Sequence, residues 1–358
     1  MKSLLIFLPT IGYGGAEMSL TRIAGYLSEH NKINVHLVVA KKLKKRSEID
    51  ISKQLNITYL GSKKTIFSFF KLLKFIRTYK PDVILSTLPT PNILLITLKK
   101  LRLIKSRVVI REANSNYLYW DKGLLNKIKG IVAVFAFNNS DANIFISQEL
   151  QTNLERYISN KQNTTIYNPV FSYNFFDKSS EQVKNFKKPN SELWVTTSRL
   201  EHQKGLDIFF EASYSFLENK NFSILVVGGG SLESYYKNKY SDLPITFIGN
   251  VDNPLKYLNL ADIFFFPSRR EGLGNSLIEA QILGKNIISS DCPSGPKEII
   301  NLFENGMLFE SGNVDELVQT IENFQMKDNN IVSQEIISKF SVKSIGNQYF
   351  DFLLKILE

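Results

Sequence analysis

The chain has 358 residues, of which 43% are hydrophobic and 22% charged, and its formal net charge is +10. A chain of this length exceeds the size at which a single hydrophobic core keeps growing, so we expect two globular domains. The one cysteine, Cys292, excludes a disulfide framework. No apolar run reaches the roughly 18 residues that a membrane span requires, so a cytoplasmic protein is expected.

Charge is distributed unevenly along the chain. Residues 1–170 contain 26 Lys and Arg against 10 Asp and Glu, a net charge of +16. Residues 171–358 contain 18 against 24, a net charge of −6. The two halves are therefore expected to meet different partners.

The first half alternates short apolar runs with amphipathic stretches, which is typical of βα units around a parallel sheet. It begins with MKSLLIFLPT, whose apolar stretch is too short for a signal peptide and predicts a buried first strand. The strands predicted in this half are residues 3–9, 34–40, 57–60, 82–87, 107–110, 143–147 and 164–167.

Basic amphipathic helices are predicted between these strands, at residues 63–80, 92–107 and 122–137. A helix packed on its own sheet explains any one of them. The surplus of +16 favours contact with an anionic membrane, where each nearby Lys or Arg contributes about 1 kcal/mol. Nucleic acid would suit the same charge, but no nucleic-acid-binding motif accompanies it, so we expect no nucleic-acid partner.

A second sheet is predicted after a polar, Lys-rich linker at residues 171–192. The domain boundaries expected from this pattern are 1–170 and 193–340, with a C-terminal helix over 341–358. The strands predicted in the second half are residues 193–198, 222–228, 245–249, 262–268 and 286–290. Both sheets are doubly wound α/β layers, whose ligands bind beyond the carboxyl ends of the strands.

The motif PSRREGLGNSLIEA, residues 267–280, follows a predicted strand and holds two glutamates, Glu271 and Glu279. A helix is expected to begin near Asn275, so the backbone N–H groups of residues 273–276 form an anion site. Glu279 lies one turn inside that helix and is placed to accept hydrogen bonds from a ribose diol. Alternatively, Gly272 and Gly274 only make a turn and Glu279 faces solvent.

Two more motifs follow strands. In SRLEHQKGLD, residues 198–207, Arg199 and Lys204 bracket a turn and can converge on one diphosphate. If this motif stood alone, surface ion pairing would be the favoured explanation, but it occurs together with the helix start in the same sheet. In PTIGYGGAEMSL, residues 9–20, Gly14 and Gly15 belong to a glycine turn that lets a substrate approach the backbone. This turn lacks the GxGxxG pattern, so no dinucleotide cofactor is predicted.

These motifs resemble the retaining GT-B glycosyltransferases of family 4. EGLGNSLIEA is similar to the family's E-x7-E motif, and SSDCPSGPKEII is similar to its Gly-Pro-basic-Glu segment. SRLEHQKGLD and the N-terminal Gly-Gly turn occur in the family's order, so the resemblance spans residues 9–310. It implies two Rossmann-like domains that face a central cleft, with the C-terminal helix crossing back to the first domain.

The resemblance also implies roles for individual residues. Arg199 and Lys204 would bind the donor diphosphate, Glu279 the ribose and Glu271 the transferred sugar. The base would lie at Gly249, Asn250 and Val251, and backbone amides of Leu273, Gly274, Asn275 and Ser276 would hold phosphate or sugar oxygens. The family needs no metal, the sequence has no D-x-D triplet, and no cofactor is expected.

The sequence departs from the family in the first domain, where many members carry a histidine after the fourth or fifth strand. VVIREANSN stands there instead. Either Glu112 or Asn114 takes the role of the histidine in contacting the sugar, or the step needs no such group. Arg111, Gly14 and Gly15 are also expected near the acceptor.

Together these features predict a bacterial enzyme of polysaccharide biosynthesis on the inner face of the cytoplasmic membrane. It would move a hexose or N-acetylhexosamine from a nucleotide sugar, with UDP as the favoured nucleotide, to a hydroxyl of a lipid-linked or cell-surface glycan. The alternatives are an epimerase or phosphorylase of the same fold, or a basic nucleic-acid- or lipid-binding protein with a vestigial sugar site. A pure binding module would not need the combination of Arg199, Lys204, Glu271 and Glu279.

Overall fold

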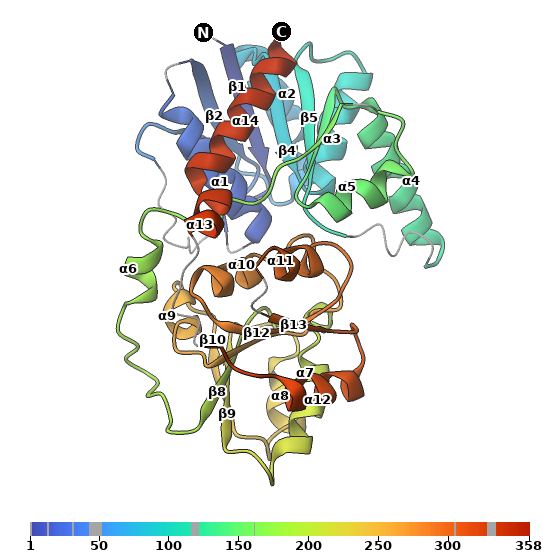
Figure 1. The fold of residues 1–358 in the computed structure, drawn as a ribbon. Coiled ribbons are helices and arrows are strands. Elements are labelled where there is room, and N and C mark those ends of the chain that lie inside the picture. The colour runs from blue at the N-terminus through green and yellow to red at the C-terminus, as the bar shows by residue number, and fades with distance from the viewer. Residues whose placement is uncertain are drawn as a thin grey trace. The chain divides into compact units, whose positions relative to one another are not determined.

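The protein is represented by a computed structural model that describes residues 2–12, 14–30, 32–42, 52–115, 122–160, 162–303, 306–327 and 334–358. It divides into two compact units. The first unit combines Met1–Pro169 with Phe340–Glu358, and the second is Val170–Lys339. Figure 1 traces the chain through both units.

The first unit is built on a parallel sheet with the strand order β3-β2-β1-β4-β5-β6-β7. The central strand β1 runs through Leu4 to Leu8 with every side chain almost fully buried, because helices cover both faces of the sheet. The strands are β1 (Lys2–Leu8), β2 (Ile33–Val39), β3 (Asn56–Tyr59), β4 (Val83–Thr87), β5 (Arg107–Glu112), β6 (Ala142–Phe145) and β7 (Asn163–Thr165).

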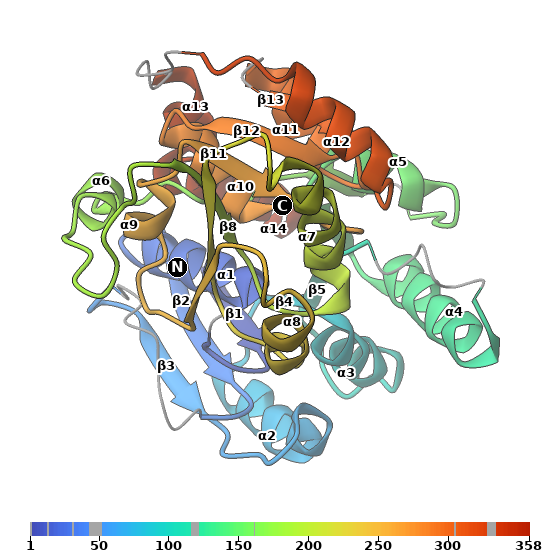
Figure 2. The same cartoon turned by 90° about the horizontal axis from the view of Figure 1, so that it is seen from below.

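Helices form the outer layers of this unit. They are α1 (Gly15–Ser28), the short 3-10 helix η1 (Thr65–Ser68), α2 (Phe69–Tyr79), α3 (Pro89–Lys100), α4 (Leu124–Asn139), α5 (Gln148–Glu155) and α14 (Val342–Leu357). The helix α3 contacts both η1 and α4, and Figure 2 shows α3 between α2 and α4.

The C-terminal helix α14 packs against α1 in the first unit. Gly346 makes this close approach possible, because a Cβ atom there would lie 2.1 Å from the ring of Tyr26. The Tyr26 hydroxyl donates a 2.7 Å hydrogen bond to Asn347. Tyr349 and Leu353 of α14 are buried in the same core, so residues 342–357 complete the hydrophobic core of the first unit. The helix α13 (Gln334–Phe340) precedes α14.

The second unit has a parallel sheet of its own with the order β10-β9-β8-β11-β12-β13. Its strands are β8 (Glu192–Thr197), β9 (Phe222–Val227), β10 (Ile245–Gly249), β11 (Ile263–Phe266), β12 (Asn286–Ser290) and β13 (Gly306–Phe309). Five of these strands are predicted by the sequence pattern, and β13 is not. This strand has four residues at the edge of the sheet and only one of them is buried, so its sequence lacks the long apolar run that identifies a buried strand.

Helices also flank the second sheet. They are α6 (Phe175–Ser179), η3 (His202–Lys204), α7 (Leu206–Ser213), η4 (Tyr214–Phe216), α8 (Glu233–Lys239), α9 (Leu255–Leu258), α10 (Asn275–Ile282), α11 (Pro296–Phe303) and α12 (Val314–Asn323). An aromatic core forms around Trp194, whose ring stacks on Phe222 with centroids 4.2 Å apart. None of the helices that the structure describes is long and apolar enough to cross a bilayer.

Candidate active site

The loops that follow β8, β9, β10 and β11 carry the residues predicted to bind the donor. These four strands are parallel and adjacent, so their carboxyl ends lie at one edge of the second sheet. The topology therefore gathers segments that are up to 80 residues apart in the sequence at one edge of this unit.

The turn between β11 and α10 ends at a glycine that no other residue replaces easily. Gly274 is the N-cap of α10 and has φ 87° and ψ 72°, in the left-handed region. A Cβ atom there would also lie 2.9 Å from the ring of Phe266. No side chain caps this helix start, and the first backbone N–H groups of a helix are the part of it that attracts anions.

Glu271 and Lys204 form an ion pair in this part of the second unit. The Nζ atom of Lys204 lies 2.5 Å from Oε1 of Glu271, and the two side chains are 15% and 10% exposed. Ser268 donates a 2.7 Å hydrogen bond to the same carboxylate oxygen. Two residues that the sequence analysis placed in the donor site for separate reasons thus contact each other directly.

The backbone around Lys204 is held against the end of β11 by a second glycine. Gly205 has φ 64°, and a Cβ atom at this position would lie 2.0 Å from the carbonyl oxygen of Pro267. Gln203 connects the same two loops, because its side chain donates to the carbonyl of Arg270 at 3.0 Å. Lys204 is therefore positioned by the contacts of both its neighbours in the chain, Gln203 and Gly205.

Arg199 lies on the same loop but in a different environment. Its side chain is exposed, and among the described residues no hydrogen bond or ion pair holds its guanidinium group. The nearby Glu201 accepts hydrogen bonds from the backbone and hydroxyl of Ser231. These bonds, and then the charge of Arg199, hold the pKa of the Glu201 carboxyl below its usual range.

The three glycines 228–230 bring the turn after β9 against the loop that carries Arg199. A Cβ atom on Gly228 would lie 2.0 Å from the carbonyl oxygen of Ser198, and one on Gly230 would lie 2.4 Å from that of Leu200. The turn is a tight connection between β9 and α8. The turn also shapes the site, since it supports the backbone on either side of Arg199.

The loop after β10 is held by the same glycine turn. The backbone N–H of Gly229 donates to Oδ1 of Asn250 at 3.0 Å, and Gly228 donates to the carbonyl of Gly249 at 2.9 Å. Gly249 itself has φ 77°. Asn250 is exposed and Val251 is half-buried, so the predicted base-binding residues lie at an accessible, backbone-anchored loop.

The remaining predicted donor residues lie on α10 and its first turn. Glu279 is half-buried, as are Asn275 and Ser276, whereas Leu273 is buried. Leu273 packs beneath the glycine of the predicted Gly-Pro segment. A Cβ atom on Gly295 would lie 2.5 Å from the Cα atom of Leu273, which explains why a glycine stands there.

Ser268 belongs to the site but was not predicted from the sequence; it is 1% exposed and donates a hydrogen bond to Glu271. Its carbonyl oxygen in turn accepts a 2.5 Å hydrogen bond from the hydroxyl of Ser290 at the end of β12. The signal in the sequence was its position as the last residue of the predicted strand DIFFFPS. One serine among many does not stand out without the tertiary contact.

In the first unit, the predicted glycine turn begins α1. Gly14 is the N-cap, and a Cβ atom there would meet the carboxylate of Glu17 at 1.9 Å. Glu17 also accepts a 2.7 Å hydrogen bond from the hydroxyl of Thr10. A carboxylate therefore already lies at this helix start, while Gly14 and Gly15 remain exposed.

Arg111 is fully buried at the end of β5. Its guanidinium group donates to Thr87 at 3.2 Å and to the side chain of Asn168. Next to Asn168, the carbonyl of Pro169 accepts a 2.9 Å hydrogen bond from Arg22 of α1. Arg111 thus links β5 to Asn168, near the end of the segment Met1–Pro169. Direct contact between Arg111 and an acceptor stays a prediction.

Glu112 is the next residue and is 9% exposed. Burial raises the pKa of its carboxyl to about 7, against the opposing effects of backbone hydrogen bonds and the charge of Arg111. The backbone N–H of Asn114 donates to Oε1 of Glu112 at 3.1 Å. The Oδ1 atom of Asn114 is buried without a hydrogen-bond partner among the described residues, so this segment offers oxygen acceptors to a ligand.

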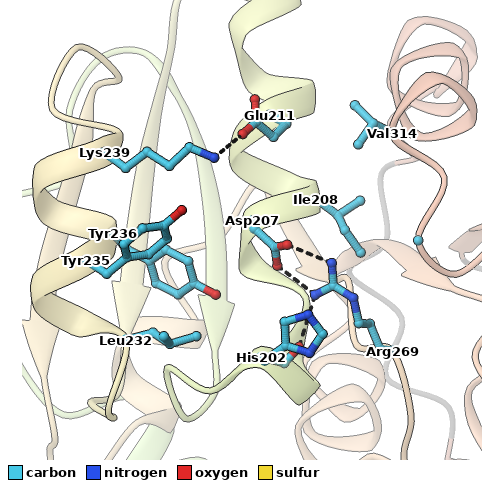
Figure 3. Close-up of a pocket in the computed structure, with 11 residues that line it drawn as sticks. His202, Asp207, Ile208, Glu211, Leu232, Tyr235, Tyr236, Lys239, Arg269 and Val314 are labelled. Carbon is cyan, nitrogen blue, oxygen red and sulfur yellow. Dashed lines mark hydrogen bonds and ion pairs between the residues drawn. The ribbon is translucent and has the colours of Figure 1, made fainter.

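A separate pocket of about 310 Å³ lies on the helical face of the second unit (Figure 3). Its charged side chains pair with each other, because Arg269 makes two 2.7 Å hydrogen bonds to Asp207 and Lys239 lies 2.7 Å from Glu211. None of Arg199, Lys204, Glu271 and Glu279 lines it. The pocket and the predicted donor site are therefore different places.

Comparison with known proteins agrees with this architecture. Residues 13–171 match the family model "Glycosyltransferase Family 4", and residues 177–337 match "Glycosyl transferases group 1". The fold resembles sucrose-phosphate synthase from Thermosynechococcus elongatus, with a TM-score of 0.79, 15% identity and 99% of each chain covered. It also resembles Anabaena HepE in complex with UDP and glucose, with a TM-score of 0.77, 18% identity, and 98% and 99% of the two chains covered.

Relatives are found at the level of sequence too. An uncharacterised glycosyltransferase of Methanocaldococcus jannaschii is 28% identical over 64% of this chain and 61% of its own length, so that match spans less than two thirds of the relative. An α-1,4-N-acetyl-D-galactosaminyltransferase of Campylobacter jejuni, named for a PP-undecaprenol substrate, is 27% identical over 86% of this chain and 84% of its own length. The capsular polysaccharide glycosyltransferase CapH of Staphylococcus aureus is 27% identical over 78% of each.

The two sheets, the order of the site loops and these matches define the class of the protein. The chain belongs to the GT-B glycosyltransferases. The predicted α/β fold class and the predicted glycosyltransferase activity are confirmed.

Proposed function

We propose that this glycosyltransferase moves a hexose or N-acetylhexosamine from a UDP-sugar, with retention of the anomeric configuration, to a hydroxyl of a lipid-linked glycan. The observation that carries the proposal is the ion pair between Lys204 and Glu271 beside the uncapped start of α10. It combines a cation and an anion-binding helix start with a carboxylate in one small region of the second unit.

In the proposed reaction, the bond between the anomeric carbon and the diphosphate breaks while a bond forms to the acceptor oxygen. The acceptor's proton leaves with the diphosphate, which gains negative charge as the sugar becomes oxocarbenium-like. Lys204, Arg199 and the N–H groups at the start of α10 stabilise that growing charge. Glu271 faces the positive sugar, and Glu279 accepts hydrogen bonds from the ribose.

UDP as the nucleotide is supported by the Anabaena neighbour, which is described as a complex with UDP and glucose. A lipid-linked acceptor is supported by the Campylobacter jejuni relative, whose name specifies a PP-undecaprenol oligosaccharide. The basic first half, with a net charge of +16, is suited to a site at an anionic membrane surface.

The decisive test is a panel of nucleotide sugars incubated with the full-length protein, with released nucleoside diphosphate as the readout. Release of UDP, and not GDP or ADP, that increases when an undecaprenyl diphosphate glycan is added supports the proposal. Release from GDP- or ADP-sugars alone would contradict the choice of nucleotide. Conversion of the donor sugar that no acceptor stimulates would instead favour an epimerase.

A further inference from the structure

The helix α4 of the first unit exposes more large apolar side chains than it buries. Only Gly130, Ala136 and Phe137 of this helix are buried. Its exposed apolar residues are Leu124 (75% exposed), Leu125 (75%), Ile128 (49%), Ile131 (68%), Val132 (38%) and Phe135 (49%). Such a contiguous apolar surface on one helix marks an interaction site.

The exposed residues form one stripe along the helix. At about 100° per residue, their positions fall within an arc of about 120°. Lys127 and Lys129 fall just outside the two margins of that arc. The stripe is therefore flanked on both sides by cations, which is the pattern of a helix that lies in a membrane interface.

The surroundings of the stripe carry the same sign of charge. The segment 124–139 has no Asp or Glu, and α4 packs on α3, whose end contributes further cations. Lys100 lies over the ring of Phe135, 6.0 Å from its centroid. The nearby carboxylate of Asp141 pairs with Lys99 at 2.5 Å and neutralises that cation, whereas the charge of Lys100 remains beside the stripe.

A second exposed apolar group lies on the same layer of the unit. Phe67 is 66% exposed and Phe70 is 80% exposed, at the junction of η1 and α2. The helix α3 contacts both η1 and α4, and Figure 2 shows α3 between α2 and α4. Exposed apolar side chains thus lie on the elements at both sides of α3.

Among the occupants that suit such a surface, the charge pattern favours a bilayer over a second copy of the chain. In a two-fold contact the stripe would face itself and bring Lys127 and Lys129 near the same cations of the partner. An anionic bilayer offers an apolar interior to the stripe and negative headgroups to the lysines that flank it. We propose that α4 docks the first unit onto anionic membranes by inserting its apolar stripe at the boundary between headgroups and acyl chains.

This inference rests on the proposed function in that a lipid-linked acceptor brings the enzyme to a membrane. It is tested with the full chain and vesicles of phosphatidylglycerol and phosphatidylcholine, compared with phosphatidylcholine alone. Ile128→Gln combined with Ile131→Gln removes the centre of the stripe, where both side chains are exposed in the free protein. We expect binding to anionic vesicles to weaken at least about tenfold.

The matched control is Leu217→Gln combined with Met326→Gln, which also replaces two exposed apolar residues but in the second unit. Its vesicle binding should equal that of the unchanged protein. Equal loss in both double variants, or no loss in either, would overturn the role of α4. Unchanged circular dichroism and Tm in the α4 variant show that its loss of binding does not come from unfolding.

A second measurement reports insertion directly. The only cysteine, Cys292, is buried, so Ile131→Cys labelled with an environment-sensitive dye should shift to shorter wavelength on anionic vesicles. A label at Leu217→Cys should not shift. A bound protein whose label at position 131 stays in water would overturn insertion, as would self-association in analytical ultracentrifugation that the Ile128→Gln/Ile131→Gln variant abolishes.

Release of nucleoside diphosphate from the donor separates the two proposals. If the protein releases UDP but does not bind anionic vesicles, the proposed transfer stands and the docking role of α4 is refuted. If α4 inserts into anionic vesicles but the protein turns over no nucleotide sugar, the docking role of α4 stands and the proposed transfer is refuted.

Discussion

The ammonium group of Lys204 lies 2.5 Å from a carboxylate oxygen of Glu271, in surroundings where each side chain is at most 15% exposed. Each of these charges neutralises the other in the absence of a ligand. When a donor binds, its diphosphate and sugar would take over the roles that the two side chains now play for each other.

This pairing predicts how the two residues contribute to stability. Lys204→Met leaves the Glu271 carboxylate nearly buried without its cation, so we expect a loss of about 3 to 5 kcal/mol in the free energy of unfolding. Adding Glu271→Gln should recover much of that loss, because no buried charge remains. Urea unfolding of the two single variants and the double variant tests this. Additive losses in the double variant would show that the residues do not interact in solution.

Glu279→Ala should weaken the binding of the donor and of free nucleoside diphosphate alike, because the ribose is common to both. A hydrogen bond to a charged group contributes about 1.5 to 3 kcal/mol, which is roughly ten- to a hundredfold in affinity. Titration calorimetry with UDP measures it. Glu322→Ala, at an exposed position of α12, is the matched control and should leave the affinity unchanged. An unchanged affinity in Glu279→Ala would remove this residue from the site.

Glu112 predicts a dependence of stability on pH. Burial raises the pKa of its carboxyl from 4.5 to about 7, so the unfolded chain releases this proton at lower pH than the folded protein. The contribution of Glu112 to stability is therefore fully present below about pH 4.5, declines as pH rises towards 7 and is constant above it.

The corresponding variant is Glu112→Gln, which cannot titrate. Relative to this variant, the unchanged protein should lose up to about 3 kcal/mol of unfolding free energy between pH 4.5 and pH 8. Chemical unfolding of both proteins at several pH values measures the difference. If the difference in unfolding free energy between the two proteins stays constant across this pH range, the carboxyl of Glu112 is exposed to water and its pKa is not raised.

Gly205 and Gly312 allow a test of close packing at the active site. Both have positive φ, 64° and 95°, so alanine strains the backbone at either position by about 1 kcal/mol. Only at Gly205 would the new Cβ atom meet a backbone oxygen, 2.0 Å away at Pro267. Gly205→Ala should therefore displace Lys204 and reduce kcat at least about tenfold, whereas Gly312→Ala should retain activity. Equal effects of the two variants on kcat would refute the packing argument.

The basic side chains of α2 predict a dependence of membrane binding on salt. Replacing Lys71, Lys74 and Arg77 with glutamine should weaken binding to anionic vesicles and leave UDP affinity intact, because these residues belong to the first unit. Binding of the unchanged protein should fall as salt rises from about 0.05 to 0.5 M, since the Debye length shrinks to a few ångströms. Co-sedimentation with vesicles and calorimetry with UDP measure the two quantities. Strong binding to RNA of any sequence with a steep salt dependence, and none to vesicles, would favour the nucleic-acid alternative.

Much of the fold followed from local patterns in the sequence. Strands such as SLLIFLP and DIFFFPS are continuous apolar runs, and strands buried on both faces by helices need that composition. The glycine-broken turn before Asn275 predicted a helix start from the glycine spacing, and the left-handed φ of Gly274 gives the reason. The edge strand β13 was missed because an edge strand with one buried residue has no such run.

The contacts within the site depended on tertiary structure. The sequence by itself determined that Arg199, Lys204, Glu271 and Glu279 follow strands of one parallel sheet, and hence that they lie at one edge. It did not determine that Lys204 pairs with Glu271, because that contact joins residues 67 positions apart through the packing of Gly205 on Pro267.

In the first unit, too, the sequence predicted the helices, whereas only the tertiary structure showed their contacts. Residues 122–137 read as one more basic amphipathic helix, and the composition of such a helix does not reveal which face meets the sheet. Only the packing of α4 on α3 shows that its apolar stripe points away from the core. Periodicity reports where apolar side chains lie around a helix axis, whereas their burial is decided by the neighbours that the fold brings to each face.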